Sequence, residues 1–424
     1  MSTAAPGPGL RRAISRWEIA GLAVNDVVGS GVYLLPAAAA ALLGSASAWA
    51  VLLAGLAVGL LVLCFAEAAS HFDEPGGAYL YTREAFGPFI GFEVGWMTWL
   101  ARVASVASLA NGLTLALGYV WPAATTGAPR VLLITTTLAL LAAINVVGVK
   151  AGARTAVALV VAKTLPLAAF VVCGAFSVER ERLAGVEWPP LGHLGQAALL
   201  LLFAYAGFEN TPAAAGEYRQ PRRDVPVALL VAMAFVTLVY SGVQVVSIGT
   251  LPGLAEAEAP LAEAARRFLG GWGGWLMTAG AILSIFGNIG GTVLVGPRYL
   301  FALARDGFGP RVLARVHPRF RTPAAAILAQ SALSLVLALS GSFVQLALLS
   351  VIARLATYIG TAAAVPVLRR RFGRRPEAFR LPGGPAIPLA ALLVALALVA
   401  STTWKNLAAG GVALLVGAVL YRWK

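Results

Sequence analysis

Charged residues are scarce in this sequence. They make up 12% of its 424 residues, whereas a soluble domain carries about 25%. Hydrophobic residues make up 59%, and the mean hydropathy is +0.82. A soluble globular protein is therefore excluded, and the composition predicts a polytopic membrane protein embedded in a lipid bilayer.

Cysteine and histidine are almost absent. The two cysteines, Cys64 and Cys173, lie inside apolar runs, so no disulfide framework is expected. His71, His193 and His317 stand far apart, without the spacing of metal ligands, and we expect neither a metal site nor a cofactor. The P-loop motif is missing too, which excludes ATP as the driving force. No metalloprotease or serine-hydrolase motif occurs within the apolar runs, so an intramembrane enzyme is a remote alternative.

Acidic residues are outnumbered, with 18 Asp and Glu against 32 Lys and Arg and a net charge of +14. In a soluble chain such a charge would suggest nucleic acid as a partner. Here the basic residues gather in short loops between apolar runs, as they do in the cytoplasmic loops of membrane proteins. We therefore expect no nucleic-acid partner.

About 12 apolar segments are long enough to cross a bilayer, for which a helix needs roughly 20 residues. We predict an all-α protein with spans at 17–43, 47–70, 89–118, 130–149, 153–177, 194–216, 225–250, 272–302, 323–341, 344–368, 386–403 and 405–422. An even number of spans places both ends of the chain on the same side.

Basic residues identify that side. The loops on the side of the N-terminus contain the basic runs at 11–16, 219–223, 305–321 and 368–380, whereas the opposite loops hold fewer basic residues, mixed with acids. Because cytoplasmic loops carry the excess of Lys and Arg, we expect a multi-pass protein of the plasma membrane with both termini in the cytoplasm.

Two of the spans are interrupted by glycine and polar residues. The first contains "NDVVGSGVYLLP", with Gly29 and Gly31, and the sixth contains "FAYAGFENTP", with Gly207. Matched interruptions five spans apart are typical of inverted repeats around a central binding site. We predict a tail at 1–16, repeats at 17–177 and 194–368, and two further spans at 386–424.

Each interruption offers backbone groups to a ligand. A half-helix that begins at "GSG" presents unpaired N–H groups, which suit a carboxylate. The half-helix that ends just before it, and one that ends near Phe203–Tyr205, present carbonyls that suit an ammonium group. Together these are the polar groups of a free α-amino acid. The alternative is that the glycines only let helices pack closely; the matched second interruption favours a binding site.

Four stretches resemble the amino acid–polyamine–organocation superfamily of permeases: "GSGVYLLP", "PGGAYLYTREAFGP", "AKTLPLAAFVVCG" and "FAYAGFE". The resemblance covers nearly the whole chain in the same order. It implies the leucine-transporter-type fold, a five-plus-five inverted repeat with broken helices one and six, followed by two C-terminal helices. It also implies a carboxylate site and an amine site, and a gating aromatic residue at Phe203. The carboxylate site would be Ser30, Gly31 and Val32, and the amine would lie against carbonyls near Val27, Val28, Phe203 and Ala204.

Ionisable residues inside the spans are costly and usually face a cavity or a partner. The resemblance places Lys163 where sodium-coupled relatives hold a sodium ion, so its ammonium would replace the cation; the alternative is a lysine that reaches back to the membrane surface. Glu209 follows the second interruption and is either a helix cap or a transport residue. Asp26 departs from the family pattern and would pair with Lys163, bind a cationic substrate group, or carry a proton.

Arg102 and Arg354 lie near the middle of the third and tenth spans. We expect both to bridge their spans to internal acids in a structural role.

These features predict a secondary active transporter of free L-amino acids that is coupled to protons and independent of sodium. Its partners would be the amino acid, protons and the bilayer. An amino-acid exchanger and a polyamine or organic-cation carrier remain the alternatives.

Overall fold

A computed structural model of the chain describes residues 14–74, 76–148, 153–184, 186, 189–373 and 378–422. Most of the predicted tail at 1–16 lies outside the described residues. The described part is built from helices, and its only strand-like element is a single backbone bridge between Ile14 and Tyr218. The prediction of an all-α polytopic membrane protein is confirmed.

Fourteen α-helices form the described part. The first seven are α1 (Arg16–Val27), α2 (Gly31–Leu43), α3 (Ser47–Ser70), α4 (Gly77–Phe86), α5 (Pro88–Gly118), α6 (Gly127–Val147) and α7 (Ala153–Ala175). The others are α8 (Leu191–Tyr205), α9 (Pro221–Thr250), α10 (Pro260–Arg305), α11 (Ala324–Ser340), α12 (Phe343–Phe372), α13 (Ala386–Ala400) and α14 (Trp404–Arg422).

Short 3₁₀ helices connect them: η1 (Gly44–Ala46), η2 (Pro122–Thr125), η3 (Arg180–Leu183), η4 (Phe208–Glu217), η5 (Leu254–Glu256) and η6 (Arg311–Ala314). Each of the twelve predicted spans corresponds to one α-helix, except the first and the sixth. The first is α1 followed by α2, and the sixth is α8 followed by η4.

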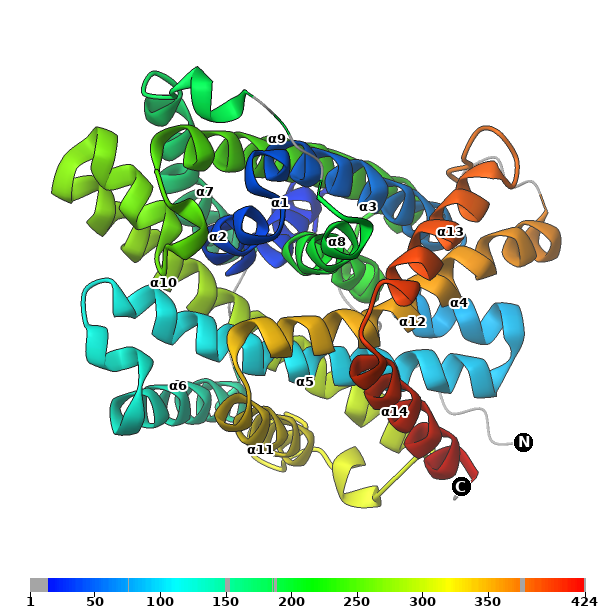
Figure 1. Ribbon diagram of the computed structural model, residues 1–424. Helices are drawn as coiled ribbons and strands as arrows, with labels where there is room; N and C mark the ends of the chain where they lie inside the picture. Colours follow the sequence, from blue (N-terminus) through cyan, green and yellow to red (C-terminus); the bar gives the residue numbers. More distant parts are fainter. Residues whose placement is uncertain are drawn as a thin grey trace, which may run out of the picture.

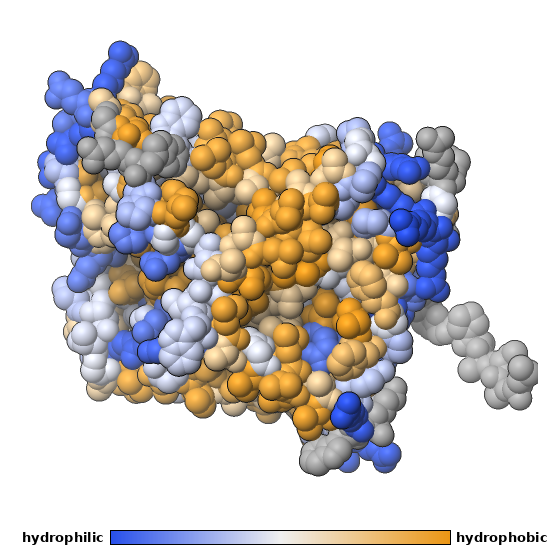
Figure 2. Space-filling view, turned by 45° about the vertical axis from the view of Figure 1, so that its right-hand side comes forward, coloured by the Kyte–Doolittle hydropathy of each residue, from blue (hydrophilic) through white to orange (hydrophobic). Residues whose placement is uncertain are grey.

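The outer surface of the bundle is apolar where lipid would contact it. Seven helical segments of the described residues are long and apolar enough to cross a membrane, and several shorter apolar helices accompany them. Figure 2 shows a band of hydrophobic residues between two polar rims. Such a band is what a bilayer's hydrocarbon core requires of the surface that it touches.

Two helical features were not predicted. The loop after the second span folds into α4, an amphipathic helix that is too short and too polar to count as a span. It is delimited by Gly76, with φ 147°, and Gly87, with φ 92°. The eighth span begins earlier than predicted, because α10 includes residues from Pro260 onward and is kinked at Gly270, where φ is 68°.

The interrupted helices occupy the middle of the bundle. In Figure 1, α1, α2 and α8 lie between the pair α3 and α9 on one side and the pair α5 and α12 on the other. Spans that are five apart in the sequence pack on each other. Span two packs on span seven (α3 on α9), span three on span eight (α5 on α10) and span four on span nine (α6 on α11). The contact of α5 with α12 likewise mirrors that of α10 with α7. This pattern supports two repeats, and their division at 17–177 and 194–368 stays a prediction.

The start of α1 is tied to the end of η4. The N–H of Ile14 donates to the carbonyl of Glu217 at 3.2 Å, and the N–H of Arg219 donates to the carbonyl of Ile14 at 3.1 Å. Arg16 adds an ion pair with Asp224 at 2.9 Å. The half-helices α1 and η4 are thus connected at their solvent ends.

Candidate functional site

The first break separates α1 from α2. Val28 is extended, with φ −72° and ψ 99°, and its N–H still donates to the carbonyl of Val24 at 2.8 Å. Ser30 is the N-cap of α2 and its carbonyl accepts from the N–H of Tyr33 and of Leu34. The N–H groups of Gly31 and its neighbours lie in the first turn, where no intrahelical carbonyl can reach them.

The second break separates α8 from η4. Ala206 is extended, with φ −74° and ψ 150°, and Gly207 has φ 129°, which favours glycine. The N–H of Gly207 donates to Oε2 of Glu209 at 2.9 Å. Glu209 therefore caps the half-helix that follows the break, as one of the two predicted roles requires. That half-helix is 3₁₀ rather than the predicted α.

The two breaks touch each other through their glycines. A methyl group placed on Gly31 would lie 2.7 Å from Cα of Ala204, and one placed on Gly207 would overlap the carbonyl of Asp26. Close helix packing, which the sequence left as an alternative, is thus one reason for both glycines. Gly29 differs, because a methyl group there would meet only the amide of Asn288, at 2.9 Å.

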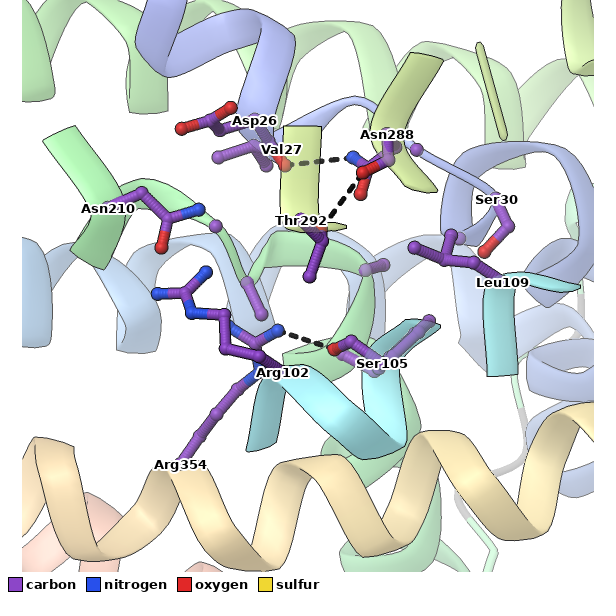
Figure 3. A pocket seen from close by; sticks show the side chains of 16 residues that line it. Asp26, Val27, Ser30, Arg102, Ser105, Leu109, Asn210, Asn288, Thr292 and Arg354 are labelled. Atoms are coloured by element: carbon purple, nitrogen blue, oxygen red, sulfur yellow. Dashed lines mark hydrogen bonds between the residues drawn. The ribbon is translucent and has the colours of Figure 1, made fainter. Parts of the chain in front are cut away.

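A small cavity lies between the breaks. Eight of the predicted site residues line it: Asp26, Val27, Gly29, Ser30, Gly31, Phe203, Ala204 and Gly207. The other lining residues are Arg102, Ser105, Leu109, Ala206, Asn210, Asn288, Thr292 and Arg354. Val28, Val32, Tyr205, Lys163 and Glu209 do not line it. Figure 3 shows the polar side chains that converge there.

Carbonyls at both breaks already accept hydrogen bonds from the protein. The hydroxyl of Tyr240 lies 3.2 Å from the carbonyl of Val27 and 3.3 Å from that of Ala204, and shares its single hydrogen between them, so it bridges the breaks. The carbonyl of Phe203 accepts from the N–H of Ala206 at 3.3 Å. Each carbonyl keeps a second lone pair, with which it can accept from a ligand.

The side chain of Lys163, a residue of α7, reaches the C-terminal end of α1. This side chain is 0% exposed, and its Nζ donates to the carbonyls of Asn25 and Val28 at 3.3 and 3.4 Å. Ser284 of α10 donates to the same Val28 carbonyl at 3.1 Å. The lysine thus supplies positive charge where a half-helix presents free carbonyls. Its burial excludes the alternative in which the side chain reaches the membrane surface.

Comparison with known proteins agrees with this architecture. A family profile described as "Amino acid permease" matches residues 14–416. The chain belongs to the amino acid permease family. Its relatives, and hence the permease itself, are transporters rather than enzymes. The cavity between two broken helices is therefore the place to look for the transported molecule.

Relatives with similar sequence identity to the permease are named as transporters of different molecules. The permease is 29% identical to the branched-chain amino acid permease BcaP of Bacillus subtilis, over 97% of this chain and 92% of that protein. It is 30% identical to the serine/threonine exchanger SteT of the same organism, over 96% and 95%. A third relative there, a methylthioribose transporter, is 27% identical over 92% and 88%.

Glu209 and Arg354 form a buried ion pair in the permease. An oxygen of Glu209 contacts Nη1 of Arg354, whose Nη2 donates to Oγ of Ser105 at 2.6 Å. The hydroxyl of Tyr358 donates to the same carboxylate at 3.3 Å. Arg354 therefore connects the tenth span to an internal acid, as predicted.

Arg102 and Asp26 lack the ionic partners that the sequence suggested for them. Within the described residues neither forms an ion pair, so Arg102 is not bridged to an acid and Asp26 is not paired with Lys163. The guanidinium of Arg102 lies over the ring of Tyr299, 5.6 Å from its centroid. Both charged groups face the cavity instead.

Sequence reasoning missed a polar stripe on α10. Ser284, Asn288 and Thr292 recur every fourth residue in an otherwise apolar span, which places them on one face of the helix. Asn288 donates to the carbonyl of Asp26 at 3.1 Å, and Thr292 donates to that of Asn288 at 2.9 Å. The i, i+4, i+8 spacing was the signal that could have found them.

The residues that line the cavity differ in how exposed they are. Asp26, Asn210 and Asn288 are partly exposed and lie on the side of the membrane where α1 begins. Ser30, at 1% exposed, and Leu109, at 3%, belong to the other side of the cavity and are buried. Arg102 and Thr292 also line the cavity and are buried, at 2% and 8% exposed.

Proposed function

We propose that the permease is a secondary active transporter of free L-amino acids in the plasma membrane, independent of sodium and driven by protons. Both termini would lie in the cytoplasm, as the basic loops predict. The partly exposed Asp26, Asn210 and Asn288, which line the cavity, would then lie toward the cytoplasm. Alternating access around the two breaks would expose the cavity to the outside.

Backbone groups at the breaks support an amino-acid ligand. The N–H groups of Gly29 to Val32 would receive the α-carboxylate, because a helix N-terminus favours an anion. Of the predicted carbonyls, those of Val27, Phe203 and Ala204 line the cavity and would receive the α-amine. The carbonyl of Val28 already accepts from Lys163 and Ser284 and would not. Esters and decarboxylated amines should therefore compete poorly with radiolabelled amino acids. Competition by decarboxylated amines alone would favour the polyamine or organic-cation alternative.

The position of Lys163 is the observation that carries the coupling proposal. Its Nζ lies 3.3 and 3.4 Å from two carbonyls at the end of α1. A second cation there would be repelled strongly, since charges interact over short distances with little screening in such a site. Lys163 would therefore replace a transported sodium ion.

Proton movement needs an ionisable group whose surroundings change during transport. Asp26 lines the cavity. Lys163 does not line it, but its ammonium contacts the first break at the carbonyl of Val28. Hydration of this region would change as the cavity opens to either side, and burial disfavours the charged form of any such group. Either residue could then take up and release a proton, whereas Glu209 is held by Arg354.

The test is uptake of radiolabelled amino acids into proteoliposomes with imposed proton or sodium gradients. We expect an inward proton gradient to stimulate uptake and a sodium gradient to have no effect. Lys163→Met should remove the stimulation, and Lys405→Met, at an exposed lysine, is the matched control. Accumulation that requires sodium would refute the proposal. Uptake seen only with internal amino acid would instead identify an exchanger.

A further inference from the structure

Arg102 lines the cavity with a guanidinium of which one edge has no hydrogen-bond partner among the described residues. The residue is 2% exposed, and its Nε and Nη2 have no hydrogen-bond partner among the described residues. These two nitrogens form one edge of the guanidinium, the fork that matches the oxygens of a planar acceptor. A buried donor pair without partners is costly, so a group that completes it would be bound selectively.

The residues around Arg102 determine which ligand group can pair with its two unpartnered nitrogens. Figure 3 shows its guanidinium pointing toward Asn210 and Asp26, on the part of the cavity away from Leu109. Oδ1 of Asn210 also lacks a partner in the described part of the chain. Along α5, Arg102 lies two helical turns from Leu109, or roughly 10 Å at the helical rise. The cavity therefore extends beyond the breaks toward a polar end.

We propose that this polar end is the side-chain subsite, and that it selects amino acids whose side chain ends in an acceptor oxygen. A carboxamide is the best match, because its oxygen accepts from the fork of Arg102 while its N–H₂ donates to Asp26. A carboxylate satisfies Arg102 and is opposed by Asp26. An apolar side chain of the same size leaves the fork of Arg102 without an acceptor, and this is the costly case.

The neighbouring arginine does not share this role. Arg354 is neutralised by Glu209 and donates to Ser105 and Ser350. Its donors are largely occupied, so it shapes the cavity without offering a free fork. The discrimination between polar and apolar side chains is therefore assigned to Arg102.

This inference rests on the proposed function, and a substrate series separates the two. Asparagine, aspartate and leucine are nearly isosteric, so differences among them report on the terminal group. Binding is measured as the thermal stabilisation of the purified permease by each amino acid, which does not depend on ion coupling. We expect asparagine to bind more tightly than aspartate, and leucine to bind about tenfold to hundredfold more weakly than asparagine, the effect of one charge-assisted hydrogen bond.

Variants assign the effect to named residues. Arg102→Met should abolish the preference for asparagine over leucine, and Arg102→Lys, which keeps the charge but not the fork, should restore only part of it. Asp26→Asn should shift binding from asparagine toward aspartate. If these variants do not fold, the wild-type series still decides. Equal binding of leucine and asparagine overturns the inference, whereas no binding of any amino acid overturns the proposed function itself.

Discussion

The ion pair between Glu209 and Arg354 makes a strong prediction about stability. The two residues are 3% and 6% exposed, so both charges are removed from water. Taking away one partner of such a pair leaves an uncompensated charge, which costs about 3–5 kcal/mol. Glu209→Gln should have this effect while its amide oxygen still accepts from the N–H of Gly207. Glu209→Leu also removes that cap and should cost roughly 1 kcal/mol more.

Replacing Arg354, the other partner of the pair, should lower the free energy of unfolding less. Arg354→Met leaves the carboxylate of Glu209 with the N–H of Gly207 and the hydroxyl of Tyr358, at 2.9 and 3.3 Å. These donors partly satisfy the remaining charge, so we expect a smaller loss than for Glu209→Gln. The double variant leaves no isolated charge. It should be more stable than the sum of the single losses predicts, by at least about 1.5 kcal/mol, as expected for residues in direct contact.

The measurement is the free energy of unfolding in mixed detergent micelles for the wild type, both single variants and the double variant. Additive losses would mean that the pair is not coupled. In that case Glu209 would act only as the cap of η4, and Arg354 would be held by its serine contacts.

Two further predictions concern the glycines and the orientation. Gly31→Val should abolish both uptake and correct folding, because the side chain would meet the backbone of Ala204. Gly29→Ala should be tolerated, since it displaces only an asparagine side chain; equal effects of both, seen as yield of monodisperse protein, would contradict this reasoning. Single cysteines at 180–184 should react with an impermeant thiol reagent added outside intact cells, and cysteines at 370–373 should not. The opposite labelling would invert the predicted topology.

Features that depend on residues close together in the sequence could be predicted. The breaks follow from glycine and polar residues within apolar runs, because lipid leaves an interrupted backbone without partners. The burial of Lys163 follows from its depth in the fifth span. The capping role of Glu209 follows from its position just after Gly207, because a carboxylate complements the start of a helix.

Pairings between distant spans were not predictable in the same way. Arg102 and Arg354 have the same apparent setting in the sequence, but only Arg354 lies opposite an acid. The side chains that use the carbonyls of the breaks come from α9 and α10, as Tyr240 and Ser284 do. Which of several mid-span polar residues meets which carbonyl depends on helix rotation and tilt. Those are set by packing across the whole bundle.

The attachment of α1 to η4, the half-helix that follows the second break, has a mechanical consequence. The two are joined near the membrane centre, where Gly207 abuts the backbone of Asp26, and again at their solvent ends through Ile14. Joined at two separated points, they lose the freedom to swing independently and share one degree of freedom. Exit of a bound molecule would then be a single cooperative step with one rate constant, instead of a sequence of two hinge movements with a populated intermediate.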